Sequence, residues 1–225
     1  EGARTIVRSL TVAGDSERAP LVVEYAAALA SLQKDSGLSR ADRTGALTAR
    51  VELARVDLAD DTVQVSLPEP LLSEVKALSR QMDAEISNGY ERQAVITSDA
   101  HMLAQAGLWV DSDALLRANL ARSHSPYYLM SSLAANAKAR GDKAEALRWS
   151  EEAYAKSEGP ATRLQWGASY VSALVELALR DLIAQHLVAA VGLGGGEDQD
   201  GAPPEHFHAF TASRRSSSSF TNSSA

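Results

Sequence analysis

The sequence contains no cysteine in 225 residues, so this chain can form no disulfide and perform no thiol chemistry. It also lacks an uncharged apolar run near the ~20 residues of a membrane span, and its start lacks the charged and apolar regions of a signal peptide. Positive charge is not in excess, because 22 Lys and Arg against 29 Asp and Glu give a formal net charge of -7, which repels phosphate backbones. We therefore expect no membrane span and no nucleic-acid partner.

Signals for β-strands are almost absent. The segment "TVQVSL" at 62–67 alternates briefly, but Pro68 and Pro70 follow it at once. Elsewhere apolar residues recur at spacings of three and four, the period of an amphipathic helix. Helices are predicted at about 18–34, 40–58, 70–88, 90–106, 111–122, 126–139, 143–157 and 161–191. The connections after Tyr90 are only a few residues long, which favours antiparallel neighbours in an all-α fold.

Two glycines mark a repeat within the helical pattern. Gly107 and Gly141 each stand where a helix should end, and glycine suits the left-handed backbone that follows a helix end. Their spacing of about 34 residues, shared by Ala100 and Ala134, is typical of the tetratricopeptide unit, which consists of two antiparallel helices. The spacing, more than any single residue, carries this signal.

Residues 127–160 resemble one tetratricopeptide unit, and the flanking segments resemble its neighbours more loosely. Small side chains are expected where the backbones of paired helices approach closely. The repeat positions are Leu133, Ala134, Gly141, Ala146 and Ala153 in 127–160; Ala100, Gly107, Ala114 and Ala121 in 93–122, with two extra residues in the turn; and Trp166 and Gly167 in 161–178. This register predicts antiparallel helix pairs stacked as a right-handed solenoid.

A longer stretch carries a second resemblance. Residues 91–178, which include "AANAKARGDKAEALRWSEEAYAK", resemble the helical region that follows a thioredoxin-like domain in certain exported bacterial proteins. In that family a Cys-x-x-Cys motif of the upstream domain performs the redox chemistry, so no catalytic residue is carried over to this cysteine-free chain. The resemblance implies a non-catalytic module, periplasmic rather than cytoplasmic, whose redox domain lies outside this chain.

We divide the chain into three regions. Residues 1–89 form an irregular N-terminal helical region, and 90–191 form the tetratricopeptide-like repeats. Glycine, proline and serine dominate 192–225, which is expected to be disordered because it buries too little apolar area to offset its ordering entropy. Since the chain starts at Glu1 rather than Met, we expect a processed product or an excised fragment.

The segment "ARSHSPYY" at 121–128 is the first candidate for chemistry, because Ser123 and His124 could act as a nucleophile beside a base. A structural interpretation is favoured. Ser123 or Ser125 precedes Pro126 at a helix start, where a hydroxyl can satisfy a free N–H and proline suits the first position.

Two further candidates lie near the C-terminus. His206 and His208, next to Glu205, could hold a metal weakly, but no fixed third ligand is evident. The segment "VGLGGG" at 191–196 imitates a phosphate-binding loop, yet it follows a helix rather than a strand and leads into acidic residues. We therefore expect neither a metal nor a cofactor.

A stack of helix pairs forms a concave groove that can hold a peptide or a partner's helix. The residues expected to face it, which come largely from the first helix of each pair, are Arg92, Asn119, Tyr127, Tyr128, Asn136, Arg163 and Tyr170. The favoured function is a protein-interaction module that serves as the accessory region of a thiol–disulfide oxidoreductase. The alternatives are a scaffold unrelated to redox chemistry and a helical hydrolase that uses His101 or His124.

Overall fold

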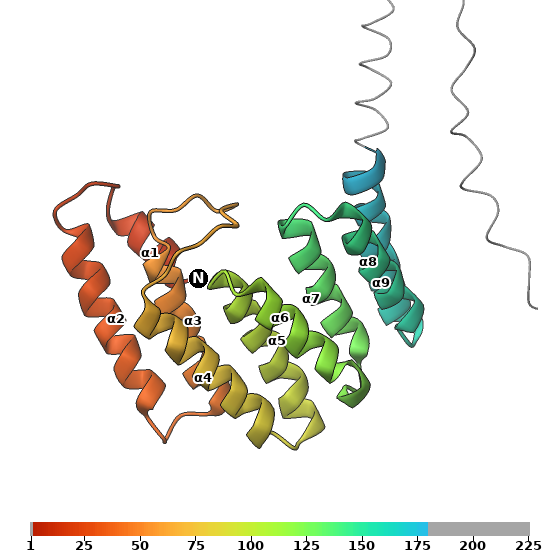
Figure 1. The fold of residues 1–225 in the computed structure, drawn as a ribbon. Coiled ribbons are helices and arrows are strands. Elements are labelled where there is room, and N and C mark those ends of the chain that lie inside the picture. Colours follow the sequence, from red (N-terminus) through yellow and green to blue (C-terminus); the bar gives the residue numbers. More distant parts are fainter. Residues whose placement is uncertain (1, 180–225) are drawn as a thin grey trace, which may run out of the picture. The chain divides into compact units, whose positions relative to one another are not determined.

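The computed structural model describes residues 2–179 (Figure 1). These residues form helices and turns without a β-strand, as the apolar periodicity predicts, and consecutive helices pack against each other. The helices are α1 (Ala3–Leu10), α2 (Arg18–Lys34), α3 (Arg40–Ala54), α4 (Glu69–Glu85), α5 (Gly89–Gln105), α6 (Trp109–Asn119), α7 (Pro126–Ala139), α8 (Lys143–Lys156) and α9 (Pro160–Leu174), with short turns η1 (Leu120–Arg122) and η2 (Val175–Leu179). The predicted disordered tail at 192–225, the segment 191–196, and His206 and His208 lie outside the described residues.

Most predicted helix bounds agree with the structure to within three residues, and those of α2 and α7 agree fully. The helix predicted at 40–58 ends earlier, at Ala54. The next residue, Arg55, leaves the helical conformation, and its buried guanidinium donates to the carbonyl oxygens of Gln105 at 2.6 Å and Thr62 at 3.1 Å. Tertiary hydrogen bonds therefore end α3 where the apolar pattern continues.

Helix α1, which has eight residues and buries only Ala3 and Val7, is absent from the predicted helices, although Ala3, Ile6, Val7 and Leu10 recur at helical spacing. Tertiary contacts hold it, because Arg8 donates from Nε to the carbonyl oxygen of Val56 at 2.9 Å. Arg8 also pairs with Asp60 at 2.7 Å. Helices this short are marginal alone, so α1 depends on these contacts with the segment after α3.

The alternating segment at 62–67 forms no strand. Instead it lies over the turn between α5 and α6, where Trp109 donates from Nε1 to the carbonyl oxygen of Val63 at 3.2 Å. A Cβ on Gly107 would lie 3.1 Å from the carbonyl oxygen of Val65. Glycine at this turn therefore permits both the left-handed backbone and the close approach of this segment.

The period set by the two glycines is a structural repeat of the turns. Gly107 and Gly141 share a φ of 79°, and each follows the last turn of its helix. The N–H of Leu108 bonds to the carbonyl oxygen of Leu103 at 2.9 Å, and one period later Asp142 bonds to Ala137 at the same distance. Both turns thus have the Schellman geometry. The next helix also begins at the same distance after each glycine.

The predicted register of 93–122 is wrong in its second helix. Ala114 and Ala121 are exposed, whereas Ser112 and Asn119 are buried. Ser112 lies one full period before Ala146, so the turn after Gly107 holds no extra residues. Ser112 takes the place of a small apolar residue because its hydroxyl donates to the carbonyl oxygen of Ala100 at 2.7 Å.

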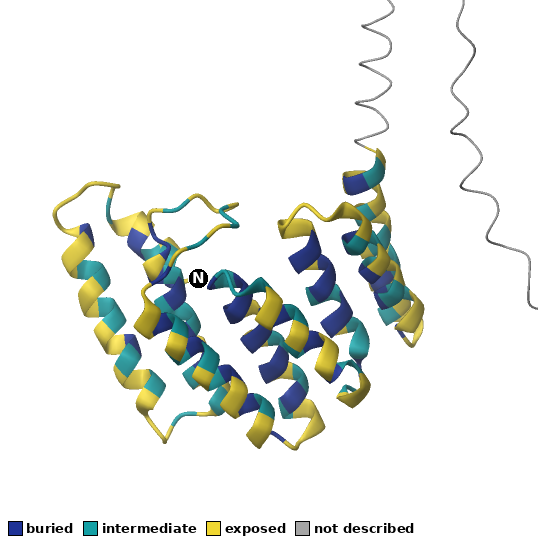
Figure 2. Ribbon diagram, viewed as in Figure 1, coloured by how far each residue is buried: buried dark blue, intermediate teal, exposed yellow. Residues whose placement is uncertain are grey.

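The other small repeat residues lie inside the helix pairs. Ala134, Ala146 and Ala153 are buried, and α7 and α8 make the most extensive helix contact of the described residues. Buried residues, dark blue in Figure 2, run along the faces that α5 and α7 turn toward their neighbours. A Cβ on Gly167 would lie 3.2 Å from the Tyr154 ring, so this glycine admits a large aromatic side chain at the α8–α9 crossing.

One hydrophobic cluster crosses the predicted boundary at 89/90. Leu47 and Val51 of α3 and Val75 of α4 pack with Met102 and Leu103 of α5. Helix α3 contacts α5, and α5 contacts α7. The regions 1–89 and 90–191 therefore share a core in their described parts.

The last predicted helix, at 161–191, is interrupted. Helix α9 ends at Leu174 and passes into the π-helical turn η2, and residues 180–191 lie outside the described part. Trp166 is the only buried residue of α9, while Leu164 and Val171 are exposed.

Candidate functional site

A cleft of about 580 Å³ opens where α3, α5 and α7 lie side by side, with α1 and α2 closing one end. Its lining consists of Gly2, Ala3, Tyr25, Ala41, Gly45, Thr48, Ala49, Glu52, Thr97, Ser98, Ala100, His101, Ser132, Ala135 and Asn136. Most of these side chains are small or carry a hydroxyl group. The helix backbones therefore border the space closely, and few long side chains fill it.

Two titratable side chains on facing helices give the cleft its electrostatic character. Glu52 lies on α3 and His101 on α5. Burial within the cleft lowers the pKa of His101, and this effect outweighs the opposing influence of Glu52. The imidazole is exposed at the cleft surface, but the surrounding protein atoms remove enough water to disfavour its charged form. His101 is therefore neutral at pH 7.

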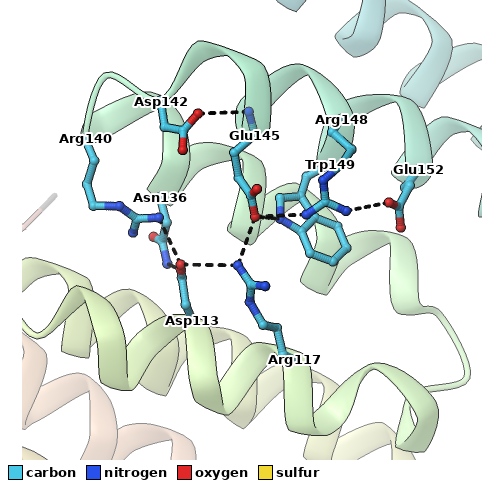
Figure 3. A network of polar contacts seen from close by, with 9 residues as sticks. All are labelled: Asp113, Arg117, Asn136, Arg140, Asp142, Glu145, Arg148, Trp149 and Glu152. Atoms are coloured by element: carbon cyan, nitrogen blue, oxygen red, sulfur yellow. Dashed lines mark hydrogen bonds and ion pairs between the residues drawn. The ribbon is translucent and has the colours of Figure 1, made fainter.

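Asn136 is fixed in the cleft wall by the polar network drawn in Figure 3. Its Nδ2 donates to the hydroxyl of Ser112 at 2.9 Å and to Asp113 Oδ1 at 2.8 Å. Arg140 completes this group by donating to Asp113 Oδ2 at 2.9 Å. Both N–H groups of the Asn136 amide are thus hydrogen-bonded within the protein. The amide oxygen remains available to accept a hydrogen bond from a ligand.

The same network joins α6 to α8. Glu145 Oε1 accepts from the Trp149 indole at 2.8 Å, from Arg148 at 2.9 Å and from Arg117 at 2.9 Å (Figure 3). These donors hold the pKa of Glu145 below its ordinary value, and the bond from Trp149 is the largest cause. The Arg148 guanidinium also lies 4.1 Å from the centroid of the Trp149 ring. The network thus fixes α8 behind the helices that form the cleft.

Aromatic side chains gather at α7, α8 and α9. Tyr127 and Tyr128 lie 5.6 and 5.4 Å from Trp166 between ring centroids, and Tyr154 stacks on Tyr170 at 6.3 Å. We call this group, Tyr127, Tyr128, Tyr154, Trp166 and Tyr170, the aromatic patch. Its exposed member is Tyr128, one helical turn before the cleft residue Ser132 on α7.

Four of the residues predicted to face a groove belong to this patch or border it. They are Tyr127, Tyr128 and Tyr170, with Arg163 packed 4.9 Å from the centroid of the Tyr154 ring. Burial, reinforced by Glu151, raises the pKa of Tyr170, so its hydroxyl is neutral at pH 7. None of these four residues lines the cleft itself.

Arg92 and Asn119, which are predicted to face a groove, do not line this cleft and are only 5% and 2% exposed, and they border a separate cavity of about 10 Å³. Arg92 donates from Nε to Asn119 Oδ1 at 2.7 Å and from Nη1 to the carbonyl oxygen of Ile86 at 2.7 Å. It also pairs with Asp83 of α4. These side chains fasten α5 to α4 and α6. Asn136, also predicted, is 7% exposed and does line the cleft.

The side chains at 123–125 show one part of each interpretation, because the Ser123 hydroxyl accepts from the backbone N–H of Ser125 at 3.1 Å and the Ser125 hydroxyl lies 2.5 Å from Nδ1 of His124. The Ser123 hydroxyl donates to Gln93, and the Ser125 hydroxyl contacts the ring of His124. Ser125 is the N-cap residue of α7 by position, but no side chain caps this helix, which corrects the predicted capping role. No group of three His, Cys, Asp or Glu side chains in 2–179 is arranged to hold a metal.

Sequence reasoning missed the N-terminal wall of the cleft. Tyr25, Gly45, Thr48 and Glu52 line it, although residues 1–89 carried no recognised repeat. A signal is present in the sequence, because Ala41, Gly45, Thr48 and Glu52 recur at the helical spacing on the face opposite the apolar stripe.

No protein-family model, curated protein or solved structure matches this chain. None of the helices in the described part is long and apolar enough to span a bilayer.

Proposed function

We propose that this chain is a non-catalytic protein-interaction module that binds a peptide segment of a partner in the cleft across α3, α5 and α7. The observation that carries the proposal is the cleft itself, formed by alternate helices that each expose a face of small and hydroxyl side chains. Its volume of about 580 Å³ falls within the ~300–1,000 Å³ typical of ligand sites.

The chemistry of the lining suits a peptide backbone. Small residues such as Gly45 and Ala135 let a backbone approach the helices closely. The hydroxyls of Thr48, Ser98 and Ser132 donate to carbonyl oxygens of their own helices, so their lone pairs can accept from peptide N–H groups. The Asn136 oxygen adds an acceptor on a rigid side chain. Tyr128 then offers an exposed aromatic anchor next to the cleft, a residue type that often dominates binding energy.

The test is affinity selection from a phage-displayed random-peptide library. Ala135→Trp places a bulky ring in the cleft without a buried residue being changed, since Ala135 is exposed. We expect selected peptides to lose at least ~10-fold in affinity for this variant. The matched control is Ala155→Trp, at an exposed position of α8 away from the cleft, which should bind normally. Equal binding by both variants would place the site elsewhere and refute the proposal.

We further propose that this chain is the accessory region of a redox protein and that the bound peptide belongs to a partner of that protein. The similarity of 91–178 to the region after a thioredoxin-like domain supports an accessory role in a periplasmic thiol–disulfide oxidoreductase. The full reading frame should then encode a Cys-x-x-Cys domain upstream of Glu1, and osmotic shock should release the full-length protein. If the full reading frame contains no such motif, the redox role is refuted, whereas the peptide-binding role is unaffected.

A further inference from the structure

Among the described residues that line the cleft, Glu52 is the only acidic residue, and none is a lysine or an arginine. The remaining side chains are apolar, hydroxyl-bearing or amide groups, apart from the neutral imidazole of His101. Glu52 packs against the start of α1, where a Cβ on Gly2 would lie 2.5 Å from its Oε2. The cleft therefore presents a single negative charge, fixed at its N-terminal wall.

The carboxylate of Glu52 lacks a partner among the described residues. Its Oε2 atom is buried and accepts no hydrogen bond there. The arginines of the neighbouring turns direct their Nη groups elsewhere, Arg55 to the carbonyl oxygens of Gln105 and Thr62 and Arg4 to Asp60, and the Nε of each is buried without a hydrogen-bond partner. No lysine or arginine lines the cleft, so no basic side chain of the lining compensates this carboxylate, and a cationic group of a ligand can take that place.

The surroundings of Glu52 also suit a cation. Tyr25 lines the same end of the cleft, and the face of a tyrosine ring attracts ammonium and guanidinium groups. Hydroxyl oxygens of Thr48 and Ser98 can accept from the same N–H donors. The net charge of -7 attracts cationic segments over a longer range.

We propose that the cleft selects a peptide with a lysine or arginine side chain and that Glu52 binds its ammonium or guanidinium group. This inference rests on the proposed function, because it names the chemistry of the peptide that the cleft takes. An acidic residue at the same place would meet an unpaired carboxylate and be excluded.

The experiment compares peptides selected from the random library by the wild-type chain and by Glu52→Gln. The substitution keeps the size of the side chain and removes its charge. Peptides that bind the wild type should be enriched in Lys or Arg, and replacement of that basic residue by Gln should weaken binding ~10-fold or more. Glu52→Gln should show the same affinity for both peptides. The matched control, Glu158→Gln, changes an exposed glutamate between α8 and α9 and should keep the wild-type preference.

The outcomes separate the two proposals. If the binding of the selected peptides is weakened by Ala135→Trp but is equally strong with Lys or Gln in the peptide, the charge preference is refuted and the peptide-binding function is supported. A basic preference that survives in Glu52→Gln also overturns it. Peptides whose binding is unaffected by Ala135→Trp overturn both proposals together. Thermal unfolding of Glu52→Gln verifies that the variant is folded before its binding is compared.

Discussion

Ser112 and Ala146 occupy equivalent positions one repeat period apart, each at the crossing between the two helices of a pair. Both are almost fully buried, at 0% and 1% exposure. Their side chains differ in chemistry, but both are small, because the crossing admits little volume. Steric limits at the crossing, more than hydrophobicity, therefore define the repeat in this chain.

The first prediction concerns the α7–α8 crossing. Ala146→Phe adds a ring to a site that is 1% exposed, and overpacking of this kind should lower the free energy of unfolding by about 1–3 kcal/mol. Ala155→Phe in the same helix is the control, since Ala155 is exposed and should tolerate the ring. Urea unfolding followed by circular dichroism measures both, and equal midpoints would contradict the assigned crossing.

The two repeat glycines predict unequal costs for the same substitution. Both have a φ of 79°, so alanine at either should cost roughly 1–2 kcal/mol of backbone strain. A Cβ on Gly141 meets nothing within 4 Å, whereas one on Gly107 lies 3.1 Å from the carbonyl oxygen of Val65. Gly107→Ala should therefore destabilise the protein more than Gly141→Ala. The reverse order in urea unfolding would show that the segment at 62–67 does not pack on this turn.

The sequence predicts the helices well because their apolar spacing is local information. It also predicts the turns at Gly107 and Gly141, since a left-handed residue after a helix favours glycine in any context. It fails where the cause is tertiary. The end of α3 is an example, because Arg55 leaves the helix and binds the carbonyl oxygen of Gln105, which is 50 residues away in the chain.

At the candidate site, too, local sequence patterns and tertiary contacts differ in what they reveal. Tyr127 and Tyr128 pack on Trp166, and Tyr170 stacks on Tyr154, but none of the three predicted tyrosines lines the cleft. Arg92 and Asn119 are predicted to face a groove because of their positions in the stack of helix pairs. They are buried because they bind each other and Asp83, a pairing that residue spacing does not reveal.

This pairing yields a prediction that contrasts two arginines. Arg92→Ala removes a buried guanidinium together with its ion pair to Asp83 and its bond to Asn119, which should cost about 3–5 kcal/mol. Arg163→Ala removes an exposed side chain next to Tyr154 and should change stability by less than ~1 kcal/mol. Thermal and urea unfolding of the two variants test this contrast, and similar losses would place Arg92 at the surface.

The last prediction concerns the pH dependence of stability at Asp99. This carboxyl is 0% exposed between α3 and α5, and neither of its oxygens has a hydrogen-bond partner among the described residues. Burial raises the pKa of Asp99 to about 7, and the charge of Asp83 on α4 adds to the rise, while the hydroxyl of Thr44 on α3 opposes it. The ordinary value of 3.8 applies to the unfolded chain.

The folded state therefore holds the Asp99 proton more tightly than the unfolded state. The stabilisation from this proton is complete below the unfolded pKa, falls as pH rises from about 4 to about 7, and is gone above that range. Asp99→Asn keeps a neutral group at all pH values. Its free energy of unfolding relative to the wild type should thus rise by roughly 2–4 kcal/mol between pH 4 and pH 8.

The difference between variant and wild type isolates Asp99, because carboxylates with lowered pKa values, such as Glu74 and Glu145, change stability in the opposite direction and do so in both proteins. Asp61→Asn, at an exposed position, is the control and should show no such trend. Urea unfolding at several pH values gives the curves. If Asp99→Asn and wild type remain parallel from pH 4 to pH 8, Asp99 ionises in the folded protein as it does in water, and water must reach it between α3 and α5.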